Sequence, residues 1–150
     1  MQIIPMTTVT LPIDPAALST AQQKKVSFKS RRIFTNPRVA AGMKAVRLLA
    51  LPHRAAVCSE VPHGSPVRVE ADFLYAYPKG TPAAHRIDRA PLPHGADLDN
   101  RFKAVGDALT KAGWWEDDRA ITTLVLRKMR TTSSPRIILR VSADTAVEIC

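Results

Sequence analysis

Carboxylates concentrate in one short stretch of this chain, from Asp97 to Asp118. The stretch contains six acidic side chains against three basic ones, whereas the other 128 residues contain 19 Lys and Arg against seven Asp and Glu. A basic protein suits a polyanion such as nucleic acid. An acidic group inside it would repel phosphate unless a divalent cation lay between them. Carboxylates, Mg²⁺ and a phosphodiester together are the chemistry of a metal-dependent nuclease.

The spacing of these acids indicates which of them could share a metal. Asp97 and Asp99 stand two apart at the expected start of a helix, where both side chains could face one cation. Asp117 and Asp118 follow that helix at the start of the next strand, so one of this second pair could point back toward the first. Neighbouring strand residues face opposite ways, so we expect only one of the second pair to reach the metal.

Each of these residues also has an ordinary structural interpretation. Asp99 is a good helix N-cap, and Lys103 with Asp107 a good surface ion pair at a spacing of four. Asp97 suits a loop, and Asp117-Asp118 suits a solvated turn. Coincidence explains the whole arrangement less well, because two aspartates and a lysine stand at the start of one expected helix and a second acidic pair stands just after its end. From the residues alone, a metal site and a set of structural acids both stay open.

The bulk composition limits the class of protein. The chain has 150 residues, 45% of them hydrophobic, which fits one domain with a real core. Its net charge of +9 suits nucleic acid or an anionic membrane surface. No long apolar run, signal-peptide pattern or basic amphipathic helix with bulky aromatics supports a membrane role. We interpret Cys58 and Cys150 as free thiols in a reducing compartment.

Periodicity predicts a single small α+β domain in the order β-α-β-loop-α-β-β, with helices packed on a mixed sheet. A basic segment, 20–38, is expected to be a loop or a short ribbon. A Pro-rich segment, 78–96, is expected to be an extended loop, and 145–150 a short tail. The expected strands are 7–12, 67–77, 121–129 and 137–141, the last being a hairpin partner of the third, and the expected helices are 37–51 and 99–112.

Two of these elements have clear buried faces. In the strand 67–77, the odd positions are expected to face the core, and Arg68, Glu70 and Asp72 to face solvent. The second helix is expected to be capped by Asp99 or Asn100 and to end before a glycine at 113. Its apolar stripe comprises Leu98, Phe102, Val105, Leu109 and Ala112.

The acidic motif resembles that of a known family. Asp97-Leu98-Asp99-Asn100 with Lys103, then Asp107-Ala108-Leu109-Thr110-Lys111-Ala112-Gly113, then Trp115-Glu116-Asp117-Asp118, is similar to the RusA family of Holliday junction resolvases. These are small endodeoxyribonucleases that are common in prophages. The specific resemblance covers residues 96–130. Elsewhere it extends to the length, to Leu11-Pro12 after the first strand and to the order of elements.

The resemblance implies that residues 1–150 form one RusA-like endodeoxyribonuclease domain that works as a cytoplasmic homodimer of bacterial or phage origin. Such a protein would resolve four-way DNA junctions in recombination and repair, by symmetric paired nicks that require Mg²⁺ or, in its place, Mn²⁺. Asp97, Asp99 and Asp118 match the catalytic, metal-binding carboxylates of the family, Lys103 matches its catalytic lysine, and Asp107 and Asp117 match motif acids with secondary roles.

Two departures from the family pattern concern DNA contacts rather than chemistry. Ile13-Asp14-Pro15-Ala16-Ala17 replaces the usual turn after the first strand, and His94-Gly95-Ala96 replaces a basic run before the first motif aspartate. We expect DNA arms to be held instead by other basic side chains, which would make binding salt-dependent. These residues are Lys24, Lys25, Lys29, Arg31, Arg32, Arg38, Arg86 and Arg89.

Aromatic residues offer a second kind of DNA contact. Phe34, Tyr75, Tyr77, Trp114 and Trp115 could stack on opened bases. We expect both tyrosines and one tryptophan to serve the core or a dimer contact instead.

Two other functions compete with junction resolution. One is a Mg²⁺-dependent nuclease of the same fold that cuts other branched DNA. The other is a junction-binding protein that does not cut. The presence of Asp97, Asp99, Lys103 and Asp118 together weakens this last alternative, because a degenerate binder would have lost one of them.

Overall fold

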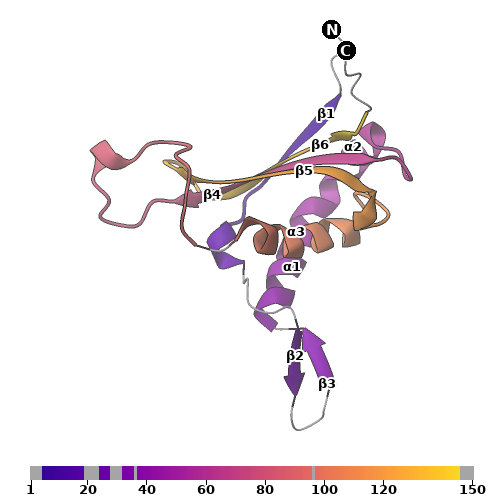
Figure 1. Cartoon of the computed structure of the whole chain (residues 1–150), viewed down its shortest axis with the longest axis horizontal. Helices are drawn as coiled ribbons and strands as arrows, with labels where there is room; N and C mark the ends of the chain where they lie inside the picture. Colours follow the sequence, from indigo (N-terminus) through magenta and orange to yellow (C-terminus); the bar gives the residue numbers. More distant parts are fainter. Residues whose placement is uncertain (1–4, 19–23, 28–31, 36, 96, 146–150) are drawn as a thin grey trace.

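The protein is described from a computed structural model of the whole chain. The structure describes residues 5–18, 24–27, 32–35, 37–95 and 97–145, and for the strands 24–27 and 32–35 it describes the backbone. This part of the chain contains a four-stranded sheet and a separate two-stranded ribbon (Figure 1).

The main sheet is mixed, as expected, and its strand order is β1-β6-β4-β5. β4 and β5 run parallel, whereas β6 is antiparallel to both of its neighbours, β1 and β4. The four strands are β1 (Met6–Leu11), β4 (Val67–Ala76), β5 (Ile121–Thr131) and β6 (Arg136–Ala143).

The expectation of a hairpin between β5 and β6 is wrong. β6 pairs with β4, which separates it from β5. β6 is buried along most of its length, so it needs a strand on each side. β5 instead pairs with β4 in parallel, because the helix α3 (Leu98–Lys111) provides the long crossover that a parallel pair requires. β4, α3 and β5 therefore form a βαβ unit, and α3 is its crossover helix.

Two long helices cover one face of the sheet. α1 (Pro37–Ala50) and α3 both lie on this side, and no helix of the described residues covers the opposite face (Figure 1). α1 begins with a proline, which is favoured at the first helical position, and buries Val39, Val46 and Ala50. The sequence did not predict α2 (Arg54–Glu60), which contacts β1 and β6, because seven residues are too few for a clear period.

The hydrophobic core lies between these helices and the sheet. From the sheet it takes odd positions of β4 together with alternate residues of β1 and β6, and from α3 it takes the predicted stripe apart from Leu98, which packs at its border. Trp114 and Trp115 also belong to the core and meet edge to face, with ring centroids 6.2 Å apart. Stacking on DNA bases is therefore excluded for both tryptophans in this conformation.

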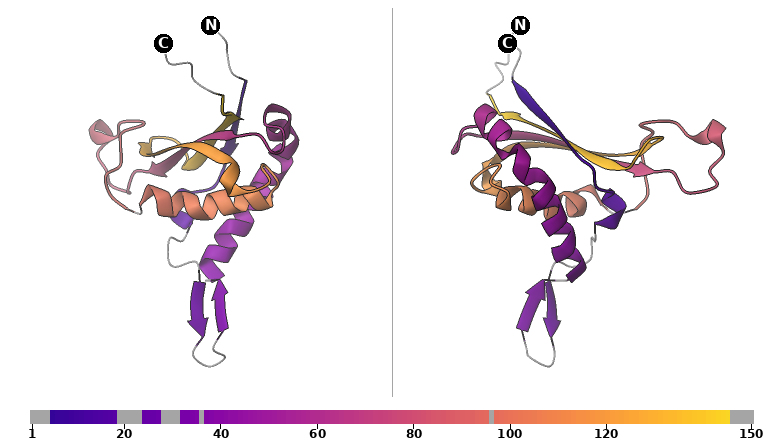
Figure 2. Two further views of the ribbon diagram at one scale, coloured as in Figure 1. Left: turned by 45° about the vertical axis from the view of Figure 1, so that its right-hand side comes forward. Right: turned by 180° about the vertical axis from the view of Figure 1, so that it is seen from behind.

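The basic segment forms the ribbon rather than an irregular loop. β2 (Lys24–Ser27) pairs antiparallel with β3 (Arg32–Thr35), and the ribbon projects away from the main sheet beyond the start of α1 (Figure 2). It is thus placed where it could reach a partner well outside the body of the protein.

The Pro-rich segment forms a projecting loop, as expected, with a short 3₁₀ turn, η3 (Ala83–His85). The hydroxyl of Tyr77 closes it by donating to the carbonyl of Ile87 at 2.6 Å and accepting from the amide of the same residue at 2.9 Å. Beyond this closure, three backbone hydrogen bonds of 2.9 to 3.1 Å join residues 89–92 to residues 128–130 of β5. The end of the loop therefore lies along the outer edge of β5.

Three further 3₁₀ turns connect the main elements. Of the two cysteines, Cys58 lies within the described residues. Cys58 is free and half-buried, as expected, whereas Cys150 lies outside the described residues. The turns are η1 (Pro15–Ala17), η2 (Leu51–His53) and η4 (Asp118–Ala120).

Candidate active site

The crossover helix α3 carries the first half of the acidic motif. Phe102, Val105 and Leu109 are buried against the sheet, so the opposite side of the helix faces outward. Asp99 and Lys103 are exposed on this outer side, and Asp107, one turn further, is half-buried. The spacing of four that the sequence showed therefore does place the three side chains along one outer face of α3.

Asp97, rather than Asp99 or Asn100, occupies the N-cap position of α3. Its backbone carbonyl accepts the first helical hydrogen bond, from the amide of Arg101 at 3.0 Å, but its carboxylate makes no capping bond. The helix therefore begins one residue earlier than expected. Asp97 and Asp99 are both exposed, and the carboxylate of Asp97 is not used in a capping hydrogen bond.

Lys103 is not held in a surface ion pair. Within the described residues, no ion pair joins it to Asp99 or to Asp107, although both lie one turn away. The structural interpretation of this lysine is therefore not supported. Its ammonium group stays in solvent beside two carboxylates.

A tight turn at the other end of α3 sets the position of the second acidic pair. Gly113 has a φ of +83°, and the amides of Gly113 and Trp114 bond back to the carbonyls of Thr110 and Leu109. This is the Schellman arrangement that ends many helices at a glycine. The chain then reverses and reaches Asp117 after three more residues.

The two aspartates of this pair differ in their surroundings. Asp117 caps η4, since its carboxylate accepts from the Arg119 amide at 2.9 Å and pairs with the Arg119 guanidinium at 3.2 Å. These bonds, the backbone bond foremost, lower the pKa of Asp117 to about 2. The hydrogen bond between the two carboxyls raises the pKa of Asp118, and the charges of Asp117 and Asp107 act in the same direction.

Asp107 therefore belongs with the second acidic pair and not with the first. It lines a shallow cavity of about 210 Å³ together with Asp117 and Asp118. Thr110, Lys111 and Glu116 complete its lining. The negative charge of Asp107 thus helps to raise the pKa of Asp118.

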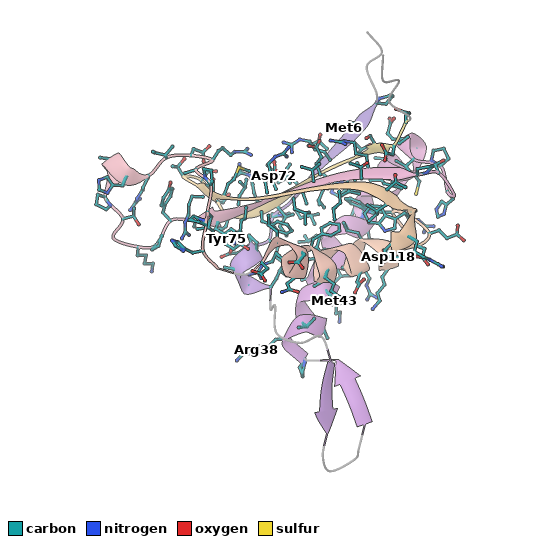
Figure 3. The ribbon with its side chains drawn as sticks, viewed as in Figure 1. Met6, Arg38, Met43, Asp72, Tyr75 and Asp118 are labelled. Carbon is teal, nitrogen blue, oxygen red and sulfur yellow. The ribbon has the colours of Figure 1, made fainter. Side chains whose placement is uncertain are left out.

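One chain does not bring Asp118 next to Asp97 and Asp99, contrary to the expectation from the sequence. Tyr75, which contacts the first turns of α3 through Arg101, and Asp118 mark opposite ends of the helix in Figure 3. A helix of 14 residues is about 21 Å long. Within the described residues, no three His, Cys, Asp or Glu side chains lie close enough to hold one metal ion. The two groups of acids therefore lie at opposite ends of α3.

The chemistry of these donors nevertheless fits Mg²⁺. Carboxylate oxygens are its preferred protein ligands, and one or two carboxylates suffice because the ion keeps several waters. Asp97 and Asp99 supply two of them on exposed backbone at the helix entrance. This pair alone therefore meets the minimum number of carboxylates that Mg²⁺ needs from a protein.

The basic residues expected to bind DNA fall on separate segments. The ribbon and the long loop project in different directions from the body (Figure 2). In the loop, Arg86 donates to the carbonyl of Thr81 at 2.8 Å, and Arg89 lies 3.9 Å from the carboxylates of Asp72 and Asp88. Lys24, Lys25 and Arg32 lie in the ribbon strands, Arg38 is exposed in the first turn of α1, and Lys29 and Arg31 lie outside the described residues.

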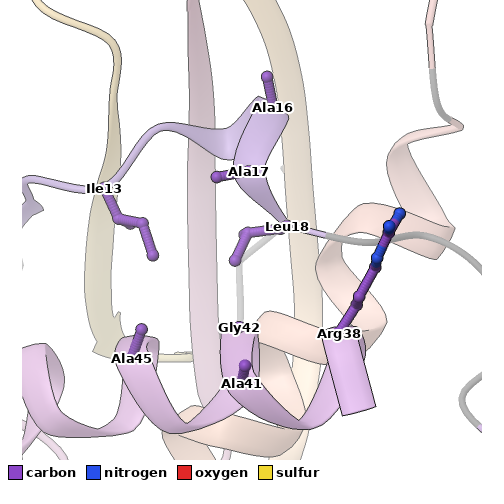
Figure 4. A pocket seen from close by; sticks show the side chains of 8 residues that line it. All are labelled: Ile13, Ala16, Ala17, Leu18, Arg38, Ala41, Gly42 and Ala45. Carbon is purple, nitrogen blue, oxygen red and sulfur yellow. The ribbon is translucent and has the colours of Figure 1, made fainter. Parts of the chain in front are cut away.

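An apolar groove of about 480 Å³ lies between η1 and the first half of α1 (Figure 4). Ile13 and Leu18 form one wall, Gly42 and its alanine neighbours form the other, and Arg38 stands at one end. Apart from that arginine, its lining side chains are apolar, so the groove has no catalytic group. Phe34, the remaining aromatic candidate, lies in β3, where the structure describes the backbone.

A buried arginine beside the motif was missed. Arg101 is 7% exposed, donates to the backbone carbonyl of Leu18 and lies over the ring of Tyr75, 5.8 Å from its centroid. Its Nε has no hydrogen-bond partner in the described part of the chain. The signal was present in the sequence, because position 101 follows Leu98 by three and falls within the apolar stripe. Arg101 ties the first turn of α3 to β4 and to Leu18, the residue after η1.

The motif and the fold agree with a comparison against known families. A family model described as Endodeoxyribonuclease RusA matches residues 12–142. This range includes all the helices and strands described here except β1 and the last residue of β6. The chain belongs to this family.

Named relatives agree with this assignment over a shorter segment. The crossover junction endodeoxyribonuclease RusA of Escherichia coli strain K12 is 46% identical over 46 residues, which are 31% of this chain and 38% of the relative. Proteins of the same name from Shigella sonnei strain Ss046 and from Enterobacteria phage 82 give the same values. The chain thus matches well under half the length of these relatives. Across the described residues, no helix is both long and apolar enough to span a membrane.

Proposed function

We propose that this protein is a Mg²⁺-dependent endonuclease that resolves four-way DNA junctions by paired nicks in two opposing strands. The observation that supports this most directly is the state of the motif side chains. Asp97, Asp99 and Lys103 are exposed at one end of a rigid crossover helix, and no ion pair among the described residues uses them. The relatives named for crossover junctions support the choice of substrate.

Three carboxylates and one lysine carry the proposed chemistry. Asp97, Asp99 and Asp118 would hold Mg²⁺ or Mn²⁺, which when bound supplies a hydroxide nucleophile and neutralises charge on the phosphate. Lys103, one turn beyond Asp99, places a point charge where it can stabilise the developing phosphorane or orient the attacking water. Asp117 has a supporting role, because its bonds to Arg119 fix the turn that presents Asp118.

The separation of the acids along α3 supports a homodimer in which each chain contributes one domain, residues 1–150. A two-fold axis perpendicular to α3 would bring the first end of one helix beside the last end of the other. Asp118 of one chain would then complete the site begun by Asp97 and Asp99 of its partner. Two equivalent sites result, as two symmetric cuts in a nearly symmetric junction require. A DNA substrate of this kind supports a location in the bacterial cytoplasm, with the protein encoded by the bacterium or by a phage.

The first test of this function is incubation of the purified protein with a synthetic four-way junction and a matched linear duplex, with Mg²⁺ or with EDTA. We expect paired nicks in the junction alone, which need Mg²⁺ and can be resealed by DNA ligase. Cutting of flaps or linear duplex at the same rate would make the protein a less selective nuclease. Tight junction binding without cuts would make it a binding protein.

The composite site is tested by mixing two inactive variants, Asp97→Asn and Asp118→Asn. If each site combines the two chains, a mixed dimer has both substitutions in one site and none in the other. It should therefore make single nicks without resolving the junction. If each site belongs to one chain, the mixture stays inactive. Each variant alone, which should bind the junction but not cut it, is the control.

A further inference from the structure

The face of the sheet turned away from α1 and α3 has a depression of about 450 Å³. Glu70 and Asp72 of β4 line its floor, and the register places Arg127 of β5 and Arg140 of β6 directly beside them. Arg89 reaches over from the long loop. Asp72 marks this face in Figure 3, well away from Asp118.

Asp72 forms ion pairs with three guanidinium groups and accepts hydrogen bonds from two of them. The sequence predicted a solvent-facing carboxylate, but Asp72 is only 3% exposed because arginines cover it. Its oxygens lie 3.0 Å from Nη1 of Arg127, 2.8 Å from Nη1 of Arg140 and 3.9 Å from Nη1 of Arg89. Arg127 and Arg140 are therefore oriented before any ligand arrives, which reduces the conformational entropy lost when a ligand binds.

The depression keeps a positive charge and donors that face solvent. Its lining has three arginines against two carboxylates. The side chains of Arg89, Arg127 and Arg140 remain 41%, 45% and 29% exposed. A guanidinium has five N–H donors, and the ion pairs within the depression engage one or two of them on each arginine.

The backbone at Arg89 is strained in a way that serves this arrangement. Among the described residues, Arg89 is the non-glycine residue with a positive φ, +67°, a conformation that costs an arginine energy and is uncommon. Two hydrogen bonds of 2.9 Å, between the amide of Arg89 and the carbonyl of Arg130 and between the amide of Arg130 and the carbonyl of Ala90, enforce it. The loop end is thus fixed on the edge of β5 with this side chain turned over the depression.

We propose that this depression binds a backbone phosphate of a DNA arm, on the face of the sheet opposite the acidic residues of α3. Convergent guanidinium groups suit the planar, two-oxygen recognition of phosphate. The surrounding chain is strongly basic, so a polyanion is drawn to this face as well. The site shares only its DNA substrate with the proposed cutting site, and it would let one protein body contact two arms of a branched DNA.

The test measures binding of a labelled linear duplex in EDTA over a series of salt concentrations, so that no cutting is needed. Arg89→Gln and Arg127→Gln are each expected to weaken binding about 3- to 10-fold and to reduce the slope of log K against log salt by about one, the value for one lost phosphate contact. Arg47→Gln, an exposed arginine on α1, is the matched control and should change neither quantity. Equal losses in all three variants, or unchanged slopes in the first two, would overturn the proposal.

A second measurement guards against misfolded variants and separates two sources of phosphate. The Nε–H signals of the arginines in the unaltered protein are followed by NMR while linear duplex or inorganic phosphate is added. Shifts at Arg89, Arg127 and Arg140 with the duplex support the proposal. Shifts with inorganic phosphate alone would assign the depression to a free anion and overturn it. Neither result depends on whether the protein cuts junctions.

Discussion

Lys103 stands one helical turn after Asp99 and one turn before Asp107, on the exposed side of α3. If its charge stabilises the transition state, Lys103→Ala should lower the single-turnover cutting rate by about 10²- to 10³-fold. The affinity for Mn²⁺, measured by calorimetry, should change little, since a lysine is not a metal ligand. Lys44→Ala, an exposed lysine of α1, serves as control. An unaltered cutting rate would remove Lys103 from the mechanism.

Asp117 and Asp118 are neighbours with different tasks. Asp117 is committed to Arg119, whereas Asp118 is exposed and has its pKa raised by the carboxyls around it. Asp118→Asn should therefore lower the cutting rate by more than about 100-fold, and Asp117→Asn by about 10-fold, as expected for a supporting partner. Rates on the same four-way junction, with binding measured in parallel, check this. The opposite ranking would identify Asp117 as the metal ligand.

The pair formed by Tyr75 and Arg101 gives a prediction that needs no substrate. Burial raises the pKa of the Tyr75 phenol above its ordinary value of 10.0, while the charge of Arg101 and its hydrogen bond oppose the rise. Arg101→Met should therefore raise this pKa further. The chain has two tyrosines, so ultraviolet titration of phenolate in a Tyr77→Phe background reports Tyr75 alone.

The control for this titration is an arginine far from Tyr75. Arg47→Met, on the exposed side of α1, should leave the pKa of Tyr75 unchanged. A fall in the pKa of Tyr75 in Arg101→Met, with the fold intact by circular dichroism, would show that the arginine does not act on the phenol as its position indicates.

The position of a single residue could be predicted from the sequence where its spacing within a motif determined it. It could not be predicted where side chains from other elements determine its surroundings. Asp99, Lys103 and Asp107 could be placed on one face of α3 because they recur at the helical spacing of four, and Asp97 at the entrance of that helix. Asp72 was expected in solvent because alternation tells which face a strand residue takes, but not what covers that face. Its three arginines come from β5, β6 and the loop, so only the folded chain assembles them.

Among the elements, the turn after α3 links stability to the site. Gly113→Ala should lower the free energy of unfolding by about 1–2 kcal/mol, the cost of a left-handed backbone for a residue with a Cβ. The new Cβ would also lie 2.8 Å from Nε of Arg54, which is a flexible side chain and can move. Urea denaturation measures the loss.

Gly64 is the matched control for this turn. Its φ of +85° is nearly the same, and no atom lies within 4 Å of the point where a Cβ would stand, so Gly64→Ala should show the backbone cost alone. We expect Gly113→Ala to reduce cutting as well, because the turn presents Asp118, and Gly64→Ala to leave cutting unchanged. Equal effects of both on cutting would show that the turn does not position the site.

Long periodic elements were predicted well, whereas the predicted hairpin between β5 and β6 was wrong. α1, α3, β1, β4 and β5 all appear within a few residues of the expected ranges, because burial of an apolar face determines them locally. The partner of β6 was wrong because adjacency in sequence favours a hairpin, while burial on both sides demands a central strand. α2 has no period to detect.

For the whole molecule, the spacing of acids along α3 makes assembly a condition for activity. If the sites are composite, the cutting rate per chain should fall as the protein is diluted below its dimer dissociation constant. Cleavage assays over a concentration series, with sedimentation equilibrium on the same samples, measure both quantities. Constant activity per chain in samples that sediment as monomers would show that one chain forms a complete site.

The position of the long loop affects how readily this sheet could aggregate through its edge strands. The edge strand β1 is short and lies between Pro5 and Pro12, whereas β5, the other edge, has 11 residues. An unpaired edge is a template for strands of other chains and hence for aggregation. Residues 89–92 occupy the last part of that edge with their own backbone hydrogen bonds. Shortening the loop would therefore lower the solubility of the protein before it lowered its stability.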